Sequence, residues 1–212
     1  MDDTLRRAAE NAKGFMPSDE GTALYEAAIE AVKRFPEAVL GEVGTYCGKS
    51  TLYLAAAVRE AGWGTVVTVD HHIGSEENQP GWEWHDPTLV DPHARRLDTL
   101  PELRRNLYDA GVEDVVVPIV GRSQLVGACW STPLAFLFLD GGHTEEQAQA
   151  DYDAWVHHVR PGGLLVIHDV FPDPAEGGQA PFHVWERAVA EGFVPWAQTG
   201  SLRVVARPEV SP

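Results

Sequence analysis

The stretch LGEVGTYCGKST, residues 40–51, decides the fold of this chain. It joins an apolar run at 38–43 to a stretch that reads as a helix over 50–61. Gly44 and Gly48 allow the backbone to turn tightly and to approach a ligand without a Cβ clash. The pattern predicts a strand, a glycine-rich turn and a helix whose free N–H groups are available to a bound molecule.

Apolar runs and helical stretches alternate through the rest of the chain. This alternation is typical of a parallel sheet covered on both faces, so we predict a doubly wound α/β fold with a mostly parallel, seven-stranded sheet. The last two runs, 192–198 and 202–207, are joined by a Thr-Gly-Ser turn that predicts an antiparallel hairpin at one edge. The other predicted strands cover 65–70, 115–120, 134–140 and 163–169, and further helices are predicted at 145–158 and 181–190.

Two parts and one insertion are expected along the chain. Residues 1–35 read as one or two helices that form part of a cap, and residues 36–212 as the ligand-binding unit. The segment 71–96 is rich in glycine and proline and lacks periodicity, and loops of this length are usually functional or disordered. Because Trp82 and Trp84 argue against disorder, we expect a mobile lid or a wall of the substrate site, with an ordered insertion or a dimer contact as the alternative.

Composition excludes several classes of partner. The chain has 212 residues, with 32 acidic and 16 basic side chains and a formal net charge of −16. Such a surface repels phosphate backbones and anionic lipids, so nucleic-acid and membrane partners are not expected. No apolar run approaches the roughly 20 residues of a membrane span, the N-terminus lacks signal-peptide features, and the two cysteines form no CxxC pair. We expect a cytoplasmic protein that acts on small molecules.

Three classes of ligand compete for the glycine-rich turn. A phosphate-binding P-loop needs four residues before its Gly-Lys-Ser, but only three separate Gly44 from Gly48. A dinucleotide fingerprint needs Gly-x-Gly, which is missing here. Glu42 precedes the turn and Asp70 ends the next strand, and these acids would repel pyrophosphate while accepting hydrogen bonds from an ammonium group and from ribose hydroxyls. The residues favour a cationic nucleoside without phosphate, such as S-adenosylmethionine.

With these residues, the chain resembles class I S-adenosylmethionine-dependent methyltransferases, in the small-molecule O-methyltransferase branch of catechol-type and antibiotic-tailoring enzymes. The matching motifs run in order through EVGTYCGKST, VDHH, VGRS, LFLDGGHTEEQAQADYDAW and PGGLLVIHDV, within about 38–207. The resemblance implies a Rossmann-like methyltransferase fold and methyl transfer to a hydroxyl. Ser123 also suits a helix N-cap. Carried over by position, the implied cofactor contacts are Glu42, Gly44, Tyr46, Cys47, Gly48, Ser50, Asp70, His71, Gly121, Arg122, Ser123 and Asp140.

Acids and histidines follow two further predicted strands. Asp140 and His143 come after one, and His168 and Asp169 end the next, so neighbouring parallel strands would bring them to one crevice. The resemblance implies Asp140, His168 and Asp169 as metal ligands, with Asp140, His143 and His168 in catalysis. His143 takes the place of a lysine general base, and a pKa near 6.5 would suit that role. His168 in place of an acid disfavours Mg²⁺ relative to Mn²⁺, Fe²⁺ or Zn²⁺.

Other functions stay open at this point. Without a metal, His143 or His168 could act as the base in O- or N-methyl transfer, oriented by Asp169. A nicotinamide-dependent oxidoreductase and a non-catalytic nucleoside-binding module belong to the same fold class. The Trp-rich insertion is also compatible with a homodimer.

Overall fold

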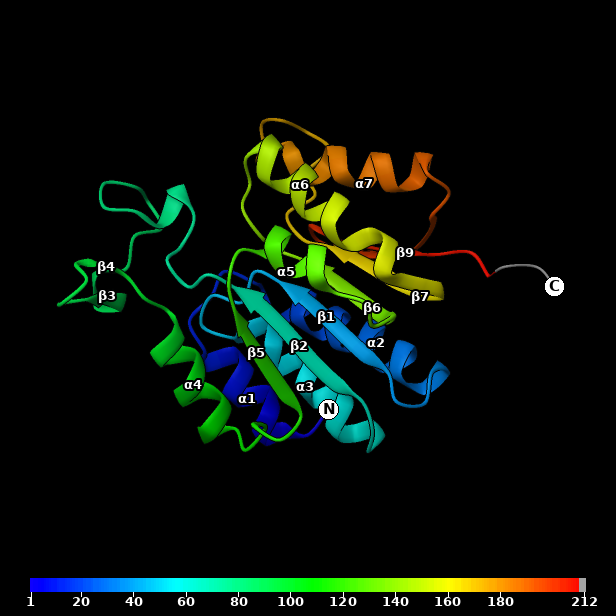
Figure 1. Cartoon of the computed structure of the whole chain (residues 1–212), viewed down its shortest axis with the longest axis horizontal. Coiled ribbons are helices and arrows are strands. Elements are labelled where there is room, and N and C mark those ends of the chain that lie inside the picture. Colours follow the sequence, from blue (N-terminus) through cyan, green and yellow to red (C-terminus); the bar gives the residue numbers. More distant parts are fainter. Residues whose placement is uncertain (210–212) are drawn as a thin grey trace.

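A central seven-stranded sheet organises the computed structural model, which describes residues 1–209. Residues 210–212, at the end of the predicted ligand-binding unit, lie outside the described part. The strand order is β5-β2-β1-β6-β7-β9-β8, with β1 in the interior of the sheet (Figure 1). The first five of these strands run parallel, and β9 and β8 add the antiparallel edge. The predicted fold class is confirmed.

The strands follow the predicted apolar runs with small shifts at their ends. The last parallel strand begins at Val159 rather than at 163, so the Pro-Gly-Gly at 161–163 lies within it, near a shift in register against β6. The strands of the sheet are β1 (Val39–Val43), β2 (Thr65–Asp70), β5 (Val116–Val120), β6 (Leu134–Leu139), β7 (Val159–Ile167), β8 (Val194–Thr199) and β9 (Leu202–Ala206).

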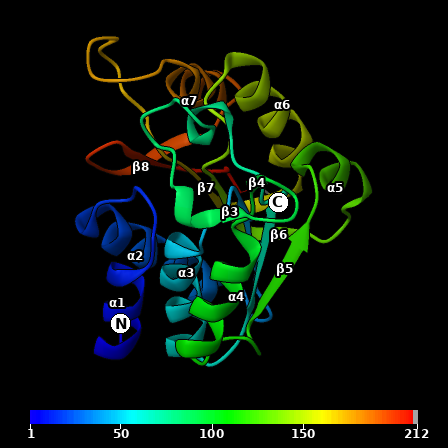
Figure 2. The same cartoon turned by 90° about the vertical axis from the view of Figure 1, so that its left-hand side faces the viewer.

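Helices cover both faces of the sheet and enclose two apolar cores (Figure 2). One core lies beneath the helices that precede β5, and the other beneath those that follow it. Among residues 1–209, no helix combines the length and the apolar character that crossing a membrane requires. The helices are α1 (Asp3–Asn11), α2 (Ser18–Arg34), α3 (Lys49–Ala61) and α4 (Leu100–Asp109) on the first face, and α5 (Ser123–Cys129), α6 (Glu145–Trp155) and α7 (Ala180–Ala190) on the second.

The insertion after β2 is partly ordered. It contains two 3₁₀ turns and a short antiparallel ribbon, β3 (Val90–Asp91) with β4 (Arg96–Leu97), and it extends away from the sheet in Figure 1. The Lys13 ammonium donates to the Asp86 carboxylate over 2.7 Å, which ties the insertion to the segment between α1 and α2. Its tryptophans are about half exposed, so burial of the indoles is not what orders the insertion. Its role as a lid stays a prediction.

Candidate active site

The turn between β1 and α3 depends on two glycines in the left-handed region. Gly44 has φ 91° and Gly48 has φ 89°, conformations that an L side chain rarely adopts. A Cβ at Gly44 would lie 1.9 Å from the carbonyl oxygen of Asp140, so the turn packs directly on the backbone at the end of β6. The turn therefore has the predicted form, and it joins the tips of two neighbouring strands.

Glu42 lies directly below this turn and is completely buried. Its Oε2 accepts a hydrogen bond from the Thr51 hydroxyl over 2.6 Å, whereas its Oε1 has no partner among the described residues. Burial raises the pKa of this carboxyl to about 7, despite the hydroxyls of Ser50, Thr51 and Thr68 around it. A buried acceptor without a donor is unfavourable, so this oxygen is suited to a donor from a ligand.

Asp70, at the tip of β2, turns its carboxylate toward the same turn. Its Oδ2 accepts from the backbone N–H groups of Thr45 and Tyr46, over 3.0 and 2.9 Å, and its Oδ1 accepts from that of His72. Asp70 and Glu42 thus meet at one turn, as expected. His71 lies beside Asp70, with its Nδ1 3.7 Å from the carboxylate. The ribose and adenine contacts predicted for these residues stay predictions.

Gly121, Arg122 and Ser123, which follow β5, are further residues predicted to contact the cofactor. The Gly121 N–H donates to the Asp70 carbonyl, which brings this end of the strand to the tip of β2. The N-cap of α5 is Arg122, and Ser123 is the first helical residue, so the N-cap role predicted for Ser123 is wrong. Its hydroxyl donates instead to Asp151, a buried acid on α6 whose pKa is raised to about 6 by burial.

Lys49 confirms the chemical reasoning against a phosphate site. Its ammonium donates to the carbonyl groups of Glu10 and Ala12, over 2.8 and 3.1 Å, and so anchors the end of α1. Cys47, on the turn, is buried, and burial raises the pKa of its thiol to about 12. The turn therefore offers neither an available lysine nor a reactive thiolate.

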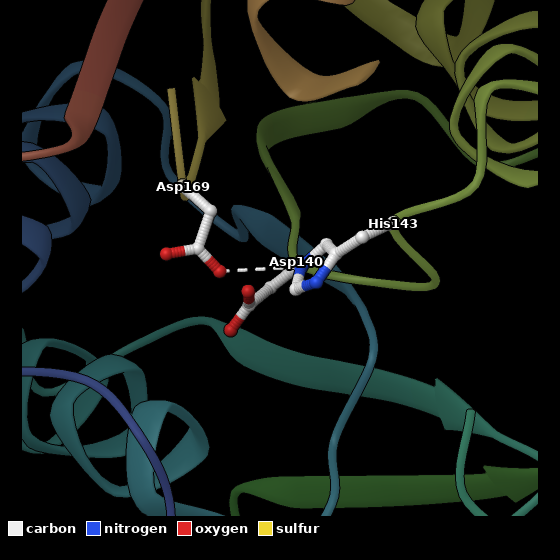
Figure 3. Close-up of side chains that lie close together, drawn as sticks. All are labelled: Asp140, His143 and Asp169. Atoms are coloured by element: carbon white, nitrogen blue, oxygen red, sulfur yellow. Dashed lines mark ion pairs between the residues drawn. The ribbon is translucent and has the colours of Figure 1, made fainter. Parts of the chain in front are cut away.

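Four residues at the tips of β6 and β7 form what we call the acid–histidine cluster: Asp140, His143, His168 and Asp169. In Figure 3 the side chains of Asp140, His143 and Asp169 converge, and the dashed line marks the 3.2 Å ion pair between His143 Nε2 and Asp169 Oδ2. One ligand atom from each of these three lies within 4.8 Å of the others. Asp169 has φ 54°, in the left-handed region that non-glycine residues seldom adopt and aspartate tolerates better than most.

His168 is buried between carboxylates, and each of its ring nitrogens contacts one of them. Its Nδ1 lies 3.1 Å from Asp140 Oδ1, and its Nε2 lies 2.6 Å from Oε2 of Glu20. Burial alone would lower its pKa, but Asp140, Asp169 and Glu20 raise the pKa to about 12. With carboxylates at both nitrogens, the imidazolium form of His168 is favoured, and the metal-ligand and catalytic roles predicted for it stay predictions. The geometry also brings His143 together with Asp140 and Asp169 as a candidate ligand set.

His143 is the member of the cluster that contacts the insertion. Its Nδ1 is 3.2 Å from Oε2 of Glu77, which belongs to the insertion. The hydrogen bond to Asp169, helped by Asp140 and Glu77, outweighs burial and raises the pKa of His143 to about 9. The pKa near 6.5 expected from the sequence is therefore corrected upward, because the sequence did not reveal how many carboxylates face this ring.

A cleft of about 500 Å³ opens beside Asp169. One wall comes from the segment before α2, another from the segment after β7, and a third from the turn between β8 and β9. Its volume is in the range of sites for drug-sized ligands. The lining residues are Phe15, Pro17, Glu20, Asp169, Val170, Phe171, Pro172, Glu176, Gly200, Ser201 and Arg203.

Comparison with known families agrees with this arrangement. A family model described as "Methyltransferase domain" matches residues 42–170, more than half of the chain. The chain belongs to this methyltransferase family. The matched segment begins at Glu42 and ends just after Asp169, so it contains both the turn and the acid–histidine cluster. The class I methyltransferase family predicted from the residues is confirmed.

Solved structures share the fold of this methyltransferase over nearly its whole length. The O-methyltransferase NovP has a TM-score of 0.71 at 17% identity, covering 97% of this chain and 88% of that one. TomG from Streptomyces achromogenes, in complex with S-adenosylmethionine, has a TM-score of 0.62 at 18% identity, covering 98% and 91%. An O-methyltransferase from Bacillus cereus, in complex with S-adenosylhomocysteine, has a TM-score of 0.60 at 19% identity, covering 98% and 92%. The Rossmann-like methyltransferase fold is thereby confirmed.

Glu20 is a residue of the candidate site that sequence reasoning missed, as is Glu77. Glu20 lies on α2, is buried, and accepts a hydrogen bond from the Ser201 N–H in addition to its contact with His168. Burial alone would raise its pKa, but His168 and the Ser201 N–H lower the pKa below its usual value. The available signal was an acid one turn before Leu24, on the apolar face of a predicted helix.

Proposed function

We propose that this methyltransferase transfers the methyl group of S-adenosylmethionine to a hydroxyl of a small molecule. The observation that carries the proposal is the convergence of two features on one rim of the sheet: the buried, half-satisfied Glu42 under the glycine-rich turn, and the acid–histidine cluster beside the cleft. The fold also matches O-methyltransferases solved with S-adenosylmethionine or S-adenosylhomocysteine.

The residues of the turn fit a cationic nucleoside. Oε1 of Glu42 lacks a donor, and the ammonium group of the methionine moiety is a donor of the opposite charge. Lys49, the lysine of the turn, does not compete for this oxygen, because its ammonium donates to carbonyl groups at the end of α1. Pyrophosphate would meet two carboxylates instead of a cation, which disfavours the nicotinamide-dependent alternative.

The chain's own contribution would be positioning and proton removal. When bound, S-adenosylmethionine supplies an electrophilic methyl group on a sulfonium. The cleft beside Asp169 would hold the acceptor hydroxyl in line and exclude water, and such orientation supplies much of the rate in reactions of this kind. His143 would accept the hydroxyl proton at Nδ1, with Asp169 orienting the ring through Nε2. Its raised pKa makes the neutral imidazole a strong base but a scarce one at pH 7.

A metal-assisted version is the second candidate. It is favoured by the donor set, since Asp140, His143 and Asp169 each offer a ligand atom in one small volume. These oxygen and nitrogen donors fit a divalent cation, which would lower the pKa of a bound hydroxyl. In this version His143 is a ligand and cannot also be the base. The two versions therefore assign different roles to the same imidazole ring.

Calorimetry tests the proposed cofactor, and a chelator distinguishes the metal-free version from the metal-assisted one. We expect S-adenosylhomocysteine to bind the purified protein and NAD to give no heat of binding. Binding of NAD alone would contradict the assignment. Methyl transfer from S-adenosylmethionine to a panel of hydroxylated acceptors, followed with and without excess EDTA, then separates the two versions. Full activity in EDTA assigns His143 as base, and loss of activity restored by Mn²⁺ or Mg²⁺ assigns it as ligand.

A further inference from the structure

Arg203 is the one cationic side chain among the residues that line the cleft. It lies on β9, next to the turn with β8, and its Nη1 donates to the carbonyl groups of Gly200 and Leu202, over 2.7 and 3.1 Å. Within residues 1–209, its Nε and Nη2 make no hydrogen bond, and no carboxylate lies within 4.0 Å of the guanidinium. The guanidinium is thus held in place by Nη1 and makes no direct ion pair within the described residues.

The carboxylates of the cleft are engaged elsewhere. Glu20 binds His168 and the Ser201 N–H, and Asp169 binds His143. Glu176 also lines the cleft but is exposed to solvent. Arg203 is half-buried, and this burial lowers the pKa of its guanidinium. Glu20 acts on this charge from beyond ion-pair distance and partly offsets the effect of burial. A half-buried cation with free donors and no direct ion pair is suited to an anionic ligand.

The free edge of the guanidinium specifies the kind of anion. With Nη1 occupied, Nε–H and Nη2–H remain as two parallel donors on one side, which is the arrangement that matches the two oxygens of a carboxylate. A doubly charged phosphate would be repelled by Glu20, Asp169 and Glu176 more strongly than a singly charged carboxylate would be. Apolar side chains, with Phe15 and Phe171 among them, line other parts of the cleft, and this favours a ring or hydrocarbon body.

We propose that the methyl acceptor carries a carboxylate, which Arg203 binds while the acceptor hydroxyl faces Asp169. The substrate class is thus a hydroxylated small-molecule acid. This inference rests on the proposed function, because it takes the cleft as the acceptor site. It assigns Arg203 to substrate selection, a role that the sequence motifs around it do not suggest.

Matched ligand pairs test the proposal by equilibrium binding. The probes are a series of hydroxybenzoates and hydroxycyclohexanecarboxylates, each with its neutral primary amide, titrated by ligand-observed NMR into the protein loaded with S-adenosylhomocysteine. A two-point, charge-assisted contact predicts a preference for acid over amide of roughly 10- to 100-fold. Absence of an acid preference in every pair overturns the inference, and so does tighter binding of the matching aryl phosphates.

Variants locate the preference. R203Q is expected to abolish the difference between acid and amide, and R203K to retain a reduced difference, because lysine keeps the charge and loses the fork. The matched control is R104Q, which removes an exposed arginine on α4 and should leave the preference unchanged. An acid preference that survives in R203Q contradicts the proposal. Circular dichroism melting verifies that each variant is folded.

The test also separates this inference from the proposed function. If the wild-type protein gives no heat with S-adenosylhomocysteine, the proposed function fails. The acid and amide titrations are then repeated without it, and they still report on Arg203, which does not line the glycine-rich turn. If S-adenosylhomocysteine binds but acids and amides bind equally, only the role of Arg203 fails.

Discussion

Buried carboxylates have opposite surroundings in two parts of the candidate site. We call these parts the cofactor half, at the tips of β1 and β2, and the acceptor half, at the tips of β6 and β7. At the tips of β1 and β2, Glu42 meets only hydroxyls and Asp70 accepts from backbone N–H groups, and burial raises the pKa of Glu42 to about 7. At the tips of β6 and β7, despite burial, bonds to His143 and His168 hold the pKa of Asp169 well below its usual value. One half lacks a cation, whereas the other has two histidines beside its carboxylates, and this difference explains why a cationic nucleoside is expected at the first half.

The largest expected effect is a loss of turnover, without loss of cofactor affinity, when His143 of the acceptor half is replaced. H143Q should lower kcat for methyl transfer by about 100- to 1,000-fold, because it removes the proposed base or ligand, while S-adenosylhomocysteine binds nearly as before. The control is H183Q, which changes an exposed histidine bound to Glu145 on the far helices. Stopped-time assays and calorimetry measure the two quantities. Equal losses of turnover and of cofactor affinity would show that the halves are not separable.

A second test acts on the contact between the halves. G44A should destabilise the protein by about 3 kcal/mol or more, because the added methyl group would overlap the Asp140 carbonyl and the backbone has a positive φ. G62A is matched to it, since Gly62 also has a positive φ of 81° but nothing lies within 4 Å of its added Cβ. It should lose only about 1 kcal/mol. Urea unfolding measures both, and similar values would contradict the close approach.

The third test concerns the sign of a charge effect in the cofactor half. Glu42 has a pKa raised from 4.5 to about 7, so the folded state keeps a proton that the unfolded state releases in this range. Its contribution to the free energy of unfolding therefore falls as pH rises from 5 to 8. The stability of E42Q relative to wild type should increase over that interval by about 2 to 3 kcal/mol.

The same variant should also weaken S-adenosylhomocysteine binding by about tenfold or more, since it removes the charge proposed to face the ammonium. Denaturant titrations at several pH values and calorimetry measure the two effects. The exposed acid Glu113 provides the control variant E113Q. A difference between E42Q and wild type that does not vary with pH would mean that Glu42 is ionised normally.

The smallest effect is expected over the acceptor half, at its cover. K13M removes the surface pair with Asp86 and should change the free energy of unfolding by less than about 1 kcal/mol. Hydrogen exchange within 76–91 should nevertheless accelerate, because that pair ties the insertion to the segment before α2. K33M, which removes a pair within α2, is the control. Unchanged exchange in K13M would show that the insertion is held by other contacts.

The sequence predicts the cofactor half better than the acceptor half. Glu42, Gly44 and Gly48 lie within one turn of chain, so their spacing alone constrains their geometry. The parallel-strand rule also places Asp140 and Asp169 together correctly. The partners of His168 escape such reasoning, because Glu20 is 148 residues away and reaches the ring only through the packing of α2. The raised pKa of His168 follows from that unseen partner and from Asp140 and Asp169, and the raised pKa of His143 follows from carboxylates whose approach the sequence does not reveal.

The bond from Glu20 to the Ser201 N–H has a consequence for how this enzyme could diversify. Helix α2, near the start of the chain, is thereby bonded to the turn between β8 and β9, near its end, and both border the cleft. Exchanging that turn among relatives would therefore rebuild the specificity wall while leaving the nucleoside pocket intact. New acceptors become accessible through a short graft of a few residues, provided that Glu20 is retained.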